Sequence, residues 1–218
     1  MSSGVPIQAV LWDFGGVILS SPFEAFARYE AAHGLSPGFI RGINSRHPDV
    51  NAWACFERGD ISVDEFATRF EAEARAAGGT LSGREVLGLI GGEIRPEMVE
   101  ALDRVRAHWR VACITNNMPV GLGPAMTRSA QHSASIAAIM ARFELVVESS
   151  KLGWRKPDPR IYAHTCTTLG VAPQACVYLD DLGINLKPAR AMGMRTIKVA
   201  SAAQALSDLR DLLGIDLC

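Results

Sequence analysis

The residues of this chain that are best suited to chemistry stand at the ends of short apolar runs. Asp13 closes the run AVLWD, and Thr115 closes VACIT and is followed by two asparagines. Asp180–Asp181 lie at the end of CVYLD and just beyond it, and Lys156 lies in the segment LGWRKPDPRIY. In an open parallel sheet, ligands bind beyond the carboxyl ends of the strands. Carboxylates, a hydroxyl, amides and an ammonium are therefore expected to meet at one edge of such a sheet.

Each of these residues also has an ordinary structural explanation. An aspartate at a strand end commonly forms a turn, Thr115 could cap the next segment, and Asn116 could belong to a turn. Asp180–Asp181 could cap the helix that follows them, and Lys156 could be a solvated surface residue. Their order along the chain, each after its own apolar run, favours the functional interpretation.

The apolar runs themselves indicate strands. Four of them are nearly continuous, as in strands covered on both faces of a parallel sheet. They are Ala9–Asp13, Val111–Thr115, Leu145–Val147 and Cys176–Asp180, and a fifth, Arg195–Val199, alternates and is typical of an edge strand. Helical patterns occur at Pro96–His108, Arg160–Gly170, Leu186–Gly193 and Ala203–Leu213. This alternation of strands and helices predicts a doubly wound α/β sheet.

Residues 21–92 interrupt that alternation. They carry four consecutive helical patterns, at Phe23–His33, Asn51–Arg58, Val63–Ala77 and Ser82–Ile90. We therefore predict an α/β core made of residues 1–20 and 93–218, with a helical insertion at 21–92. A second break, Met118–Ser135, is rich in Gly, Pro, Ser and Thr, and predicts a loop with room for one irregular helix near the mouth of the site.

Composition excludes several classes of function. The 22 basic and 23 acidic residues give a net charge of -1, so no overall field favours nucleic acid or an anionic membrane as a partner. The five cysteines show no CxxC spacing, which argues against a disulfide framework or a zinc site. Neither a signal peptide nor a run of about 20 apolar residues is evident, so we expect a cytoplasmic protein. The sequence carries no indication of oligomeric state.

Four segments together resemble the motifs of the haloacid dehalogenase superfamily. They are WDFGGVI, CITNN, RKPDPRIY and YLDDLGIN, in the order that the family has them. The longer segment LDDLGINLKPARAMGM is similar to the subfamily I branch that contains the N-terminal phosphatase domain of soluble epoxide hydrolase. The resemblance implies the family's Rossmann-like core, and it implies that residues 21–92 form the helical cap over the active site.

The resemblance also implies a role for each candidate residue. Asp13 becomes the nucleophile that forms an aspartyl-phosphate, which splits one difficult hydrolysis into two steps. Mg²⁺ neutralises the phosphate charge, and its implied protein ligands are Asp13, the backbone carbonyl of Gly15, and Asp181. The implied supporting groups are Asn185 and Asp180 behind the metal ligands, with Asp180 also able to share the metal. Thr115 and Lys156 are implied to surround the phosphoryl group, and Asn116 to hold either the substrate or the loop. The implied partner is a small organic phosphomonoester.

Gly15 departs from the pattern of the family's phosphatases. They usually carry an aspartate there that protonates the leaving group, and such acid–base help is worth about 10²–10⁴ in rate. Three explanations are open: a substrate with a good leaving group, a substitute from the insertion such as His47 or Glu24, or a silent member that binds phosphate compounds. A dehalogenase, which attacks carbon without a metal, is a further alternative. The Asp180–Asp181 pair favours a metal, since two carboxylates would otherwise repel an anionic substrate.

Overall fold

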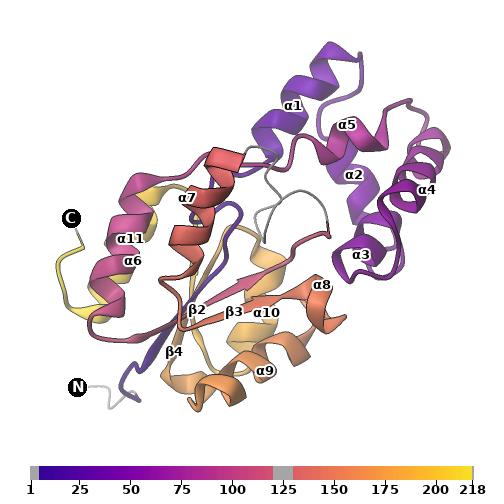
Figure 1. Cartoon of the computed structure of the whole chain (residues 1–218). Coiled ribbons are helices and arrows are strands. Elements are labelled where there is room, and N and C mark those ends of the chain that lie inside the picture. Colours follow the sequence, from indigo (N-terminus) through magenta and orange to yellow (C-terminus); the bar gives the residue numbers. More distant parts are fainter. Residues whose placement is uncertain (1–4, 120–129, 218) are drawn as a thin grey trace.

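A computed structural model describes residues 5–119 and 130–217 of the chain. Its centre is a five-stranded parallel sheet in the order β3-β2-β1-β4-β5, which confirms the predicted fold class (Figure 1). The strands are β1 (Ala9–Trp12), β2 (Arg110–Thr115), β3 (Leu145–Glu148), β4 (Cys176–Asp180) and β5 (Arg195–Lys198). β1 is central, with Trp12 in register with Cys113 of β2 and with Leu179 of β4.

Burial explains which runs became central strands. Every residue of β1 and β4 is buried, as the continuous apolar runs predicted. β5 is an edge strand, also as predicted. The prediction that β3 is covered on both faces is wrong, because β3 is the other edge and Leu145 and Val146 are only half-buried. A run of three apolar residues is too short to separate the two cases.

Helices cover both faces of the sheet, so the fold is doubly wound. α6 (Pro96–Arg106), α7 (Ala130–Met140) and α11 (Ala202–Leu213) share one hydrophobic cluster with the strand residues Val10 and Trp12. α9 (Pro159–Leu169) and α10 (Gly183–Ala191) share the opposite cluster with Ala9 and Leu11. The period of two in β1 therefore sends alternate side chains into two separate cores. Two short elements, α8 (Ser149–Leu152) and a 3-10 helix (Pro173–Ala175), complete the core.

α7 begins within Met118–Ser135, the segment where a loop with room for one irregular helix was predicted. The helix begins at Ala130, and it buries Ile136, Ile139 and Met140 against the sheet. These positions have the i, i+3, i+4 spacing of a helix face, which outweighs the serines in the first turns. The rest of that predicted loop, residues 120–129, lies outside the described residues.

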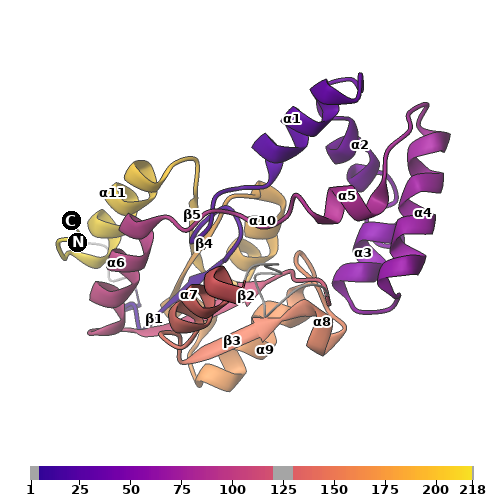
Figure 2. The ribbon, with the colours of Figure 1, turned by 45° about the horizontal axis from the view of Figure 1, so that its top comes forward.

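The helical insertion consists of five helices between β1 and α6 (Figures 1 and 2). They are α1 (Phe23–Ala32), α2 (Phe39–Ser45), α3 (Ala52–Glu57), α4 (Val63–Ala76) and α5 (Gly83–Leu87). The insertion has its own hydrophobic cluster, in which the rings of Phe56, Phe66 and Phe70 stack. α2 was not predicted, because two glycines, Gly38 and Gly42, hide its pattern.

Two features join the insertion to the core. The chain enters and leaves side by side, with Leu19 and Ile94 forming an antiparallel bridge. Met118, which follows β2, is buried in the cluster of the insertion rather than in either core of the sheet. The limits 21–92 of a separate cap domain stay a prediction, while the five helices and their shared cluster are observed.

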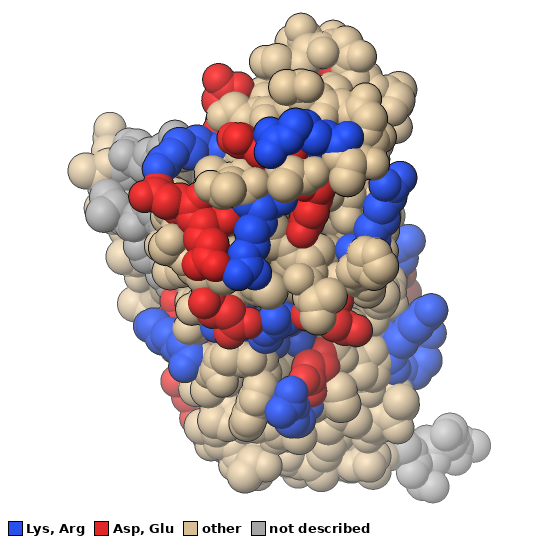
Figure 3. Space-filling model, turned by 90° about the vertical axis from the view of Figure 1, so that its right-hand side faces the viewer, with Lys and Arg blue, Asp and Glu red and all other residues tan. Residues whose placement is uncertain are grey.

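The surface has no single dominant charge on the side that Figure 3 shows, where acidic and basic groups alternate. Ion pairs such as Arg69 with Glu65 and Arg58 with Asp60 join groups of opposite charge in the insertion. No helix within residues 5–119 and 130–217 is long and apolar enough to cross a membrane.

Candidate active site

The ends of three neighbouring strands bring the predicted polar residues together. β1 lies between β2 and β4, so Asp13 directly after β1 is flanked by Thr115, the last residue of β2, and by Asp180, the last of β4. The backbone N–H of Asp13 donates to the carbonyl of Leu179 at 2.8 Å, which continues the parallel ladder one residue further. All three polar residues are buried.

Lys156 reaches into this cluster and is only 1% exposed, which removes the alternative of a surface lysine. Its Nζ lies 2.7 Å from Asp13 Oδ1 and 2.9 Å from Asp180 Oδ2. The backbone on either side of it is held by Asn116, whose Oδ1 accepts from the Lys156 N–H at 2.8 Å and whose Nδ2 donates to the Lys156 carbonyl at 3.0 Å. Asn116 therefore fixes the loop that carries the ammonium group.

The two oxygens of Asp13 differ in their surroundings. Oδ1 accepts the Phe14 N–H at 2.6 Å and also contacts Lys156. Within the described part of the chain, no hydrogen bond falls on Oδ2 or on the Thr115 hydroxyl. One carboxylate oxygen and one hydroxyl are thus available to a ligand beside the ammonium group.

Asp180 and Asp181 have different roles in the architecture. Asp180 is fully buried and accepts from the Leu182 N–H at 2.8 Å, from Asn185 Nδ2 at 3.1 Å and from the Tyr178 hydroxyl. It is thus saturated by donors from the protein, one of which is the backbone N–H of Leu182 just before α10. Asp181 is only half-buried, and Asn185 in the first turn of that helix bonds Asp180.

Two adjacent glycines shape the loop after Asp13 in different ways. Gly16 has φ +79°, and a Cβ there would lie 2.3 Å from both Cγ and Oδ2 of Asp181. Only glycine allows the carboxylate of Asp181 to approach this backbone. A Cβ on Gly15 would meet nothing within 4 Å, so that position faces open space.

Burial and mutual repulsion shape the charges of the site. Burial raises the pKa of Asp13 well above its usual value, with Asp180 and Asp181 adding to the effect and Lys156 opposing it. Burial also raises the pKa of Asp181 to about 6, again with help from Asp180 and against Lys156 and the Ser21 hydroxyl. Burial disfavours the charged form of Lys156, but the carboxylates of Asp13 and Asp180 raise its pKa overall.

The donor set fits a hard divalent cation. Carboxylate oxygens of Asp13, Asp180 and Asp181 lie within 4.8 Å of one another, although those of Asp180 already accept from protein donors. Three carboxylates face one ammonium, so the cluster carries excess negative charge, and oxygen ligands are those that Mg²⁺ prefers. The close approach of Asp181 to Gly16 shows that the backbone of this loop is built around that carboxylate.

Two residues suggested as substitutes for the missing acid are not part of this cluster. Glu24 is 89% exposed and pairs with Arg28 on the outside of α1. His47 is exposed on the segment between α2 and α3. Neither is among the groups bonded to Asp13 or Asp181 within the described residues.

Several residues of the site were not anticipated from the sequence. Tyr178 lies two residues before Asp180 in β4, and the period of two in a strand could have indicated that their side chains share a face. Asn117 bonds Glu148 and Ser150, and so ties the end of β2 to the end of β3. Glu57 of the insertion accepts from Asn116 Nδ2 at 3.3 Å, a contact across 59 positions that no local pattern indicates.

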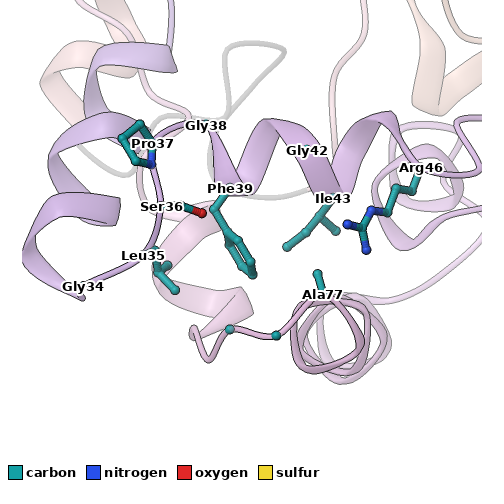
Figure 4. Close-up of a pocket in the computed structure, with 12 residues that line it drawn as sticks. Gly34, Leu35, Ser36, Pro37, Gly38, Phe39, Gly42, Ile43, Arg46 and Ala77 are labelled. Atoms are coloured by element: carbon teal, nitrogen blue, oxygen red, sulfur yellow. The ribbon is translucent and has the colours of Figure 1, made fainter.

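A separate hollow of about 350 Å³ lies wholly within the insertion (Figure 4). It is bounded by the segment before α2, by the first turns of α2 and by the glycines after α4, with Phe39 and Arg46 pointing toward it. None of the polar residues at the strand ends lines it. The hollow is therefore distinct from the cluster around Asp13.

Known proteins share the sequence pattern and the fold of this chain. The family model described as "haloacid dehalogenase-like hydrolase" matches residues 7–193. Acyl-CoA dehydrogenase family member 10 of Mus musculus is 31% identical over 99% of this chain and 20% of its own length. Bifunctional epoxide hydrolase 2 of Mus musculus is 28% identical over 95% of this chain and 39% of its own length. The chain thus spans about a fifth to two-fifths of these relatives.

Among solved structures, a HAD family enzyme from Bacteroides thetaiotaomicron in complex with magnesium and inorganic phosphate superposes with a TM-score of 0.60. It is 19% identical, and the match covers 93% of this chain and 98% of that one. At this identity the likeness establishes the fold. Together with the family match over most of the chain, it shows that this protein belongs to the haloacid dehalogenase-like hydrolases.

Proposed function

We propose that the protein is a Mg²⁺-dependent phosphatase that hydrolyses a small organic phosphomonoester through an aspartyl-phosphate on Asp13. The observation that carries this proposal is the free Oδ2 of Asp13, set beside the buried ammonium of Lys156 and the carboxylate of Asp181. The related enzyme that was solved with magnesium and inorganic phosphate supports the same chemistry.

Asp13, Asp181 and the backbone carbonyl of Gly15 are the proposed holders of the cation. When bound, Mg²⁺ supplies positive charge that allows a carboxylate to approach a phosphate dianion. Asp180 and Asn185 do not touch the reacting atoms in this proposal. Asp180 accepts from Lys156 Nζ and from Asn185 Nδ2. Asp180 and Asn185 therefore hold Lys156 and the start of α10 in place.

The proposed reaction has two displacements at phosphorus. Asp13 Oδ2 attacks the phosphorus atom, and the bond from phosphorus to the leaving oxygen breaks as the aspartyl-phosphate forms. A water molecule then attacks the same phosphorus, which breaks the bond to Oδ2 and regenerates the carboxylate, while both protons of the water leave with the free phosphate. Lys156 and the Thr115 hydroxyl stabilise the phosphoryl oxygens during both displacements.

Gly15 limits the class of substrate. It offers no proton to the departing oxygen, and no described side chain replaces the missing group beside Asp13. We therefore infer a phosphate ester whose alcohol is already a good leaving group, so that protonation from the enzyme contributes little. The helical insertion acts as the cap that closes over such a substrate, and the cytoplasmic location expected from the sequence suits a metabolite phosphatase.

A metal-independent dehalogenase is the second candidate, favoured by one observation. Lys156 already balances the charge of Asp13, and Gly15 lacks the phosphatase acid, so attack on carbon would need no further group at that position. Against it, Asp180 and Asp181 would repel a substrate carboxylate. A silent phosphate-binding member is the remaining alternative.

Hydrolysis of an aryl phosphate tests the proposal, because its leaving group needs no protonation. Turnover by the wild type in Mg²⁺, loss of turnover on chelation, and loss in Asp13→Asn are the expected results, since an amide cannot serve as the nucleophile. Full activity in Asp13→Asn would refute the role of Asp13. Release of halide from a 2-haloacid without metal would instead identify the dehalogenase.

A further inference from the structure

Glu57 is a buried acid of the insertion that reaches the core. It is the last residue of α3, and its side chain is only 10% exposed. Acidic side chains are seldom buried at this level unless their charge is paired. Figures 1 and 2 place α3 next to α8, on the side where the strands β2 and β3 end.

Both oxygens of Glu57 accept hydrogen bonds. Oε1 accepts from Trp53 Nε1 at 3.0 Å, within the insertion. Oε2 accepts from Arg155 Nε at 2.5 Å and from Asn116 Nδ2 at 3.3 Å, both in the core. The backbone carbonyl of Glu57 accepts from the Ser149 hydroxyl at 2.5 Å. One residue of the insertion is thus bonded to three segments around the site.

A continuous series of contacts leads from Glu57 to the nucleophile. Asn116 also accepts from the backbone N–H of Lys156 and donates to the backbone carbonyl of Lys156. Lys156 Nζ in turn contacts Asp13 Oδ1 at 2.7 Å. Arg155 is the residue directly before Lys156, so Glu57 holds the lysine loop from two sides.

We propose that Glu57 is a positioning residue for this active site, which aligns Asn116 and thereby Lys156 when the insertion is seated on the core. The role in turnover rests on the proposed phosphatase function. Within the part of the chain that the structure describes, no hydrogen bond or ion pair joins Glu57 to the nucleophile or to the proposed metal ligands, so its side chain acts on the lysine loop through Asn116 and Arg155. The insertion consequently does more than cover the site, since it supplies an acceptor that the lysine loop needs.

The chemistry requires a carboxylate at this position. Glu57 receives three N–H donors and donates none. A glutamine has one oxygen and one NH₂ group, so its NH₂ group must face either Trp53 or the pair Arg155 and Asn116, and one of these sides loses its acceptor. In both orientations Arg155 loses the negative charge that it pairs with. Glu57→Gln therefore tests the contact while it keeps the size of the side chain.

Glu30 offers a matched control. It is likewise a buried acid of the insertion, 3% exposed, and among the described residues its carboxylate accepts only from the N–H groups of Gly38 and Ile40, inside the insertion. Glu30→Gln loosens the insertion without touching the lysine loop. A general loss of stability would affect both variants, whereas a positioning role affects Glu57→Gln alone.

The experiment measures kcat and KM for an aryl phosphate, and amide hydrogen exchange at Lys156, in wild type and both variants. We expect Glu57→Gln to lose about tenfold or more in kcat with little change in KM, as is typical for groups that orient active-site residues. The amide of Lys156 should exchange faster in that variant, because its acceptor Asn116 is less well held. Glu30→Gln should match the wild type in both readouts.

Two results would overturn the proposal. One is unchanged exchange at Lys156 in Glu57→Gln, and the other is an equal loss in Glu30→Gln. A wild type without phosphatase activity would refute the proposed function separately, and the exchange comparison would then decide the role of Glu57 by itself.

Discussion

The close approach of Gly16 to Asp181 gives a sharp test of how the proposed metal site is built. Gly16→Ala places a methyl group 2.3 Å from Cγ of Asp181, on a backbone with φ +79°. Carbon atoms in contact lie about 3.5–4.0 Å apart, so the carboxylate must move by about 1 Å or more. Mg²⁺ accepts little distortion of its ligands, and such a shift should weaken its binding by about tenfold or more.

The backbone cost can be separated from the collision. A left-handed conformation costs a residue with a Cβ about 1–2 kcal/mol, which corresponds to a fall in Tm of roughly 2–8 °C for a chain of this size. Gly38 has nearly the same φ, +77°, and a Cβ there would meet nothing within 4 Å. Gly38→Ala therefore carries the backbone cost alone, and the difference between the two variants reports the displacement of Asp181.

Thermal unfolding with and without Mg²⁺, together with titration calorimetry of Mg²⁺, measures both parts. We expect both variants to lose Tm without metal, and Gly16→Ala alone to lose the stabilisation that Mg²⁺ gives the wild type. Mg²⁺ binding by Gly16→Ala as tight as that by Gly38→Ala would refute the reasoning that Asp181 must stand against this glycine to hold the cation.

Three further predictions concern the charged groups. Lys156→Met should destabilise the metal-free protein by about 3–5 kcal/mol, since Asp13 and Asp180 lose their buried partner, and urea unfolding checks this. The pKa of Asp181 is raised to about 6 in the folded protein. Without metal, the stability that protonated Asp181 contributes is therefore full below its unfolded pKa near 3.8 and is lost as pH rises through about 6. Asp181→Asn should remove this fall in stability, which Tm measured from pH 4 to 8 checks. Gly15→Asp should fit the open space after Asp13 and raise turnover of alkyl phosphates, with poor leaving groups, by up to about 10²–10⁴.

The core of the fold was predictable because short apolar runs in the sequence mark its strands. The runs that became β1 and β4 are buried on both faces, and period-two alternation then assigns each side chain to one of two clusters. Parallel strand order also places Asp13, Thr115 and Asp180 at a common edge before any contact is known. α2 was not predicted, because Gly38 and Gly42 weaken its helical pattern. α7 was predicted only as an irregular helix, because its start is rich in serine. In both, burial against the rest of the protein still favours the helix.

The contacts that orient the site residues were less predictable. The asparagine after Thr115 was expected to bind either the substrate or the loop, and its observed hydrogen bonds go to Lys156 and Glu57. The contact to Glu57 depends on how the insertion sits on the core, a tertiary relation with no sequence period. Lys156 itself was identified through its motif, yet its burial follows from the two carboxylates that pair with it.

The charge balance of the cluster links the proposed cation to the proposed nucleophile. Asp13 must be ionised to attack phosphorus, but burial and two neighbouring carboxylates raise its pKa, and Lys156 is the described group that opposes them. Lys156 cannot do this for Asp13 alone, because it also pairs with Asp180. A cation shared by Asp13 and Asp181 would lower both pKa values at once. Asp180 is saturated by protein donors, so the half-buried Asp181 is the residue that would share the cation with Asp13. On this reasoning, ionisation of the nucleophile depends on the metal.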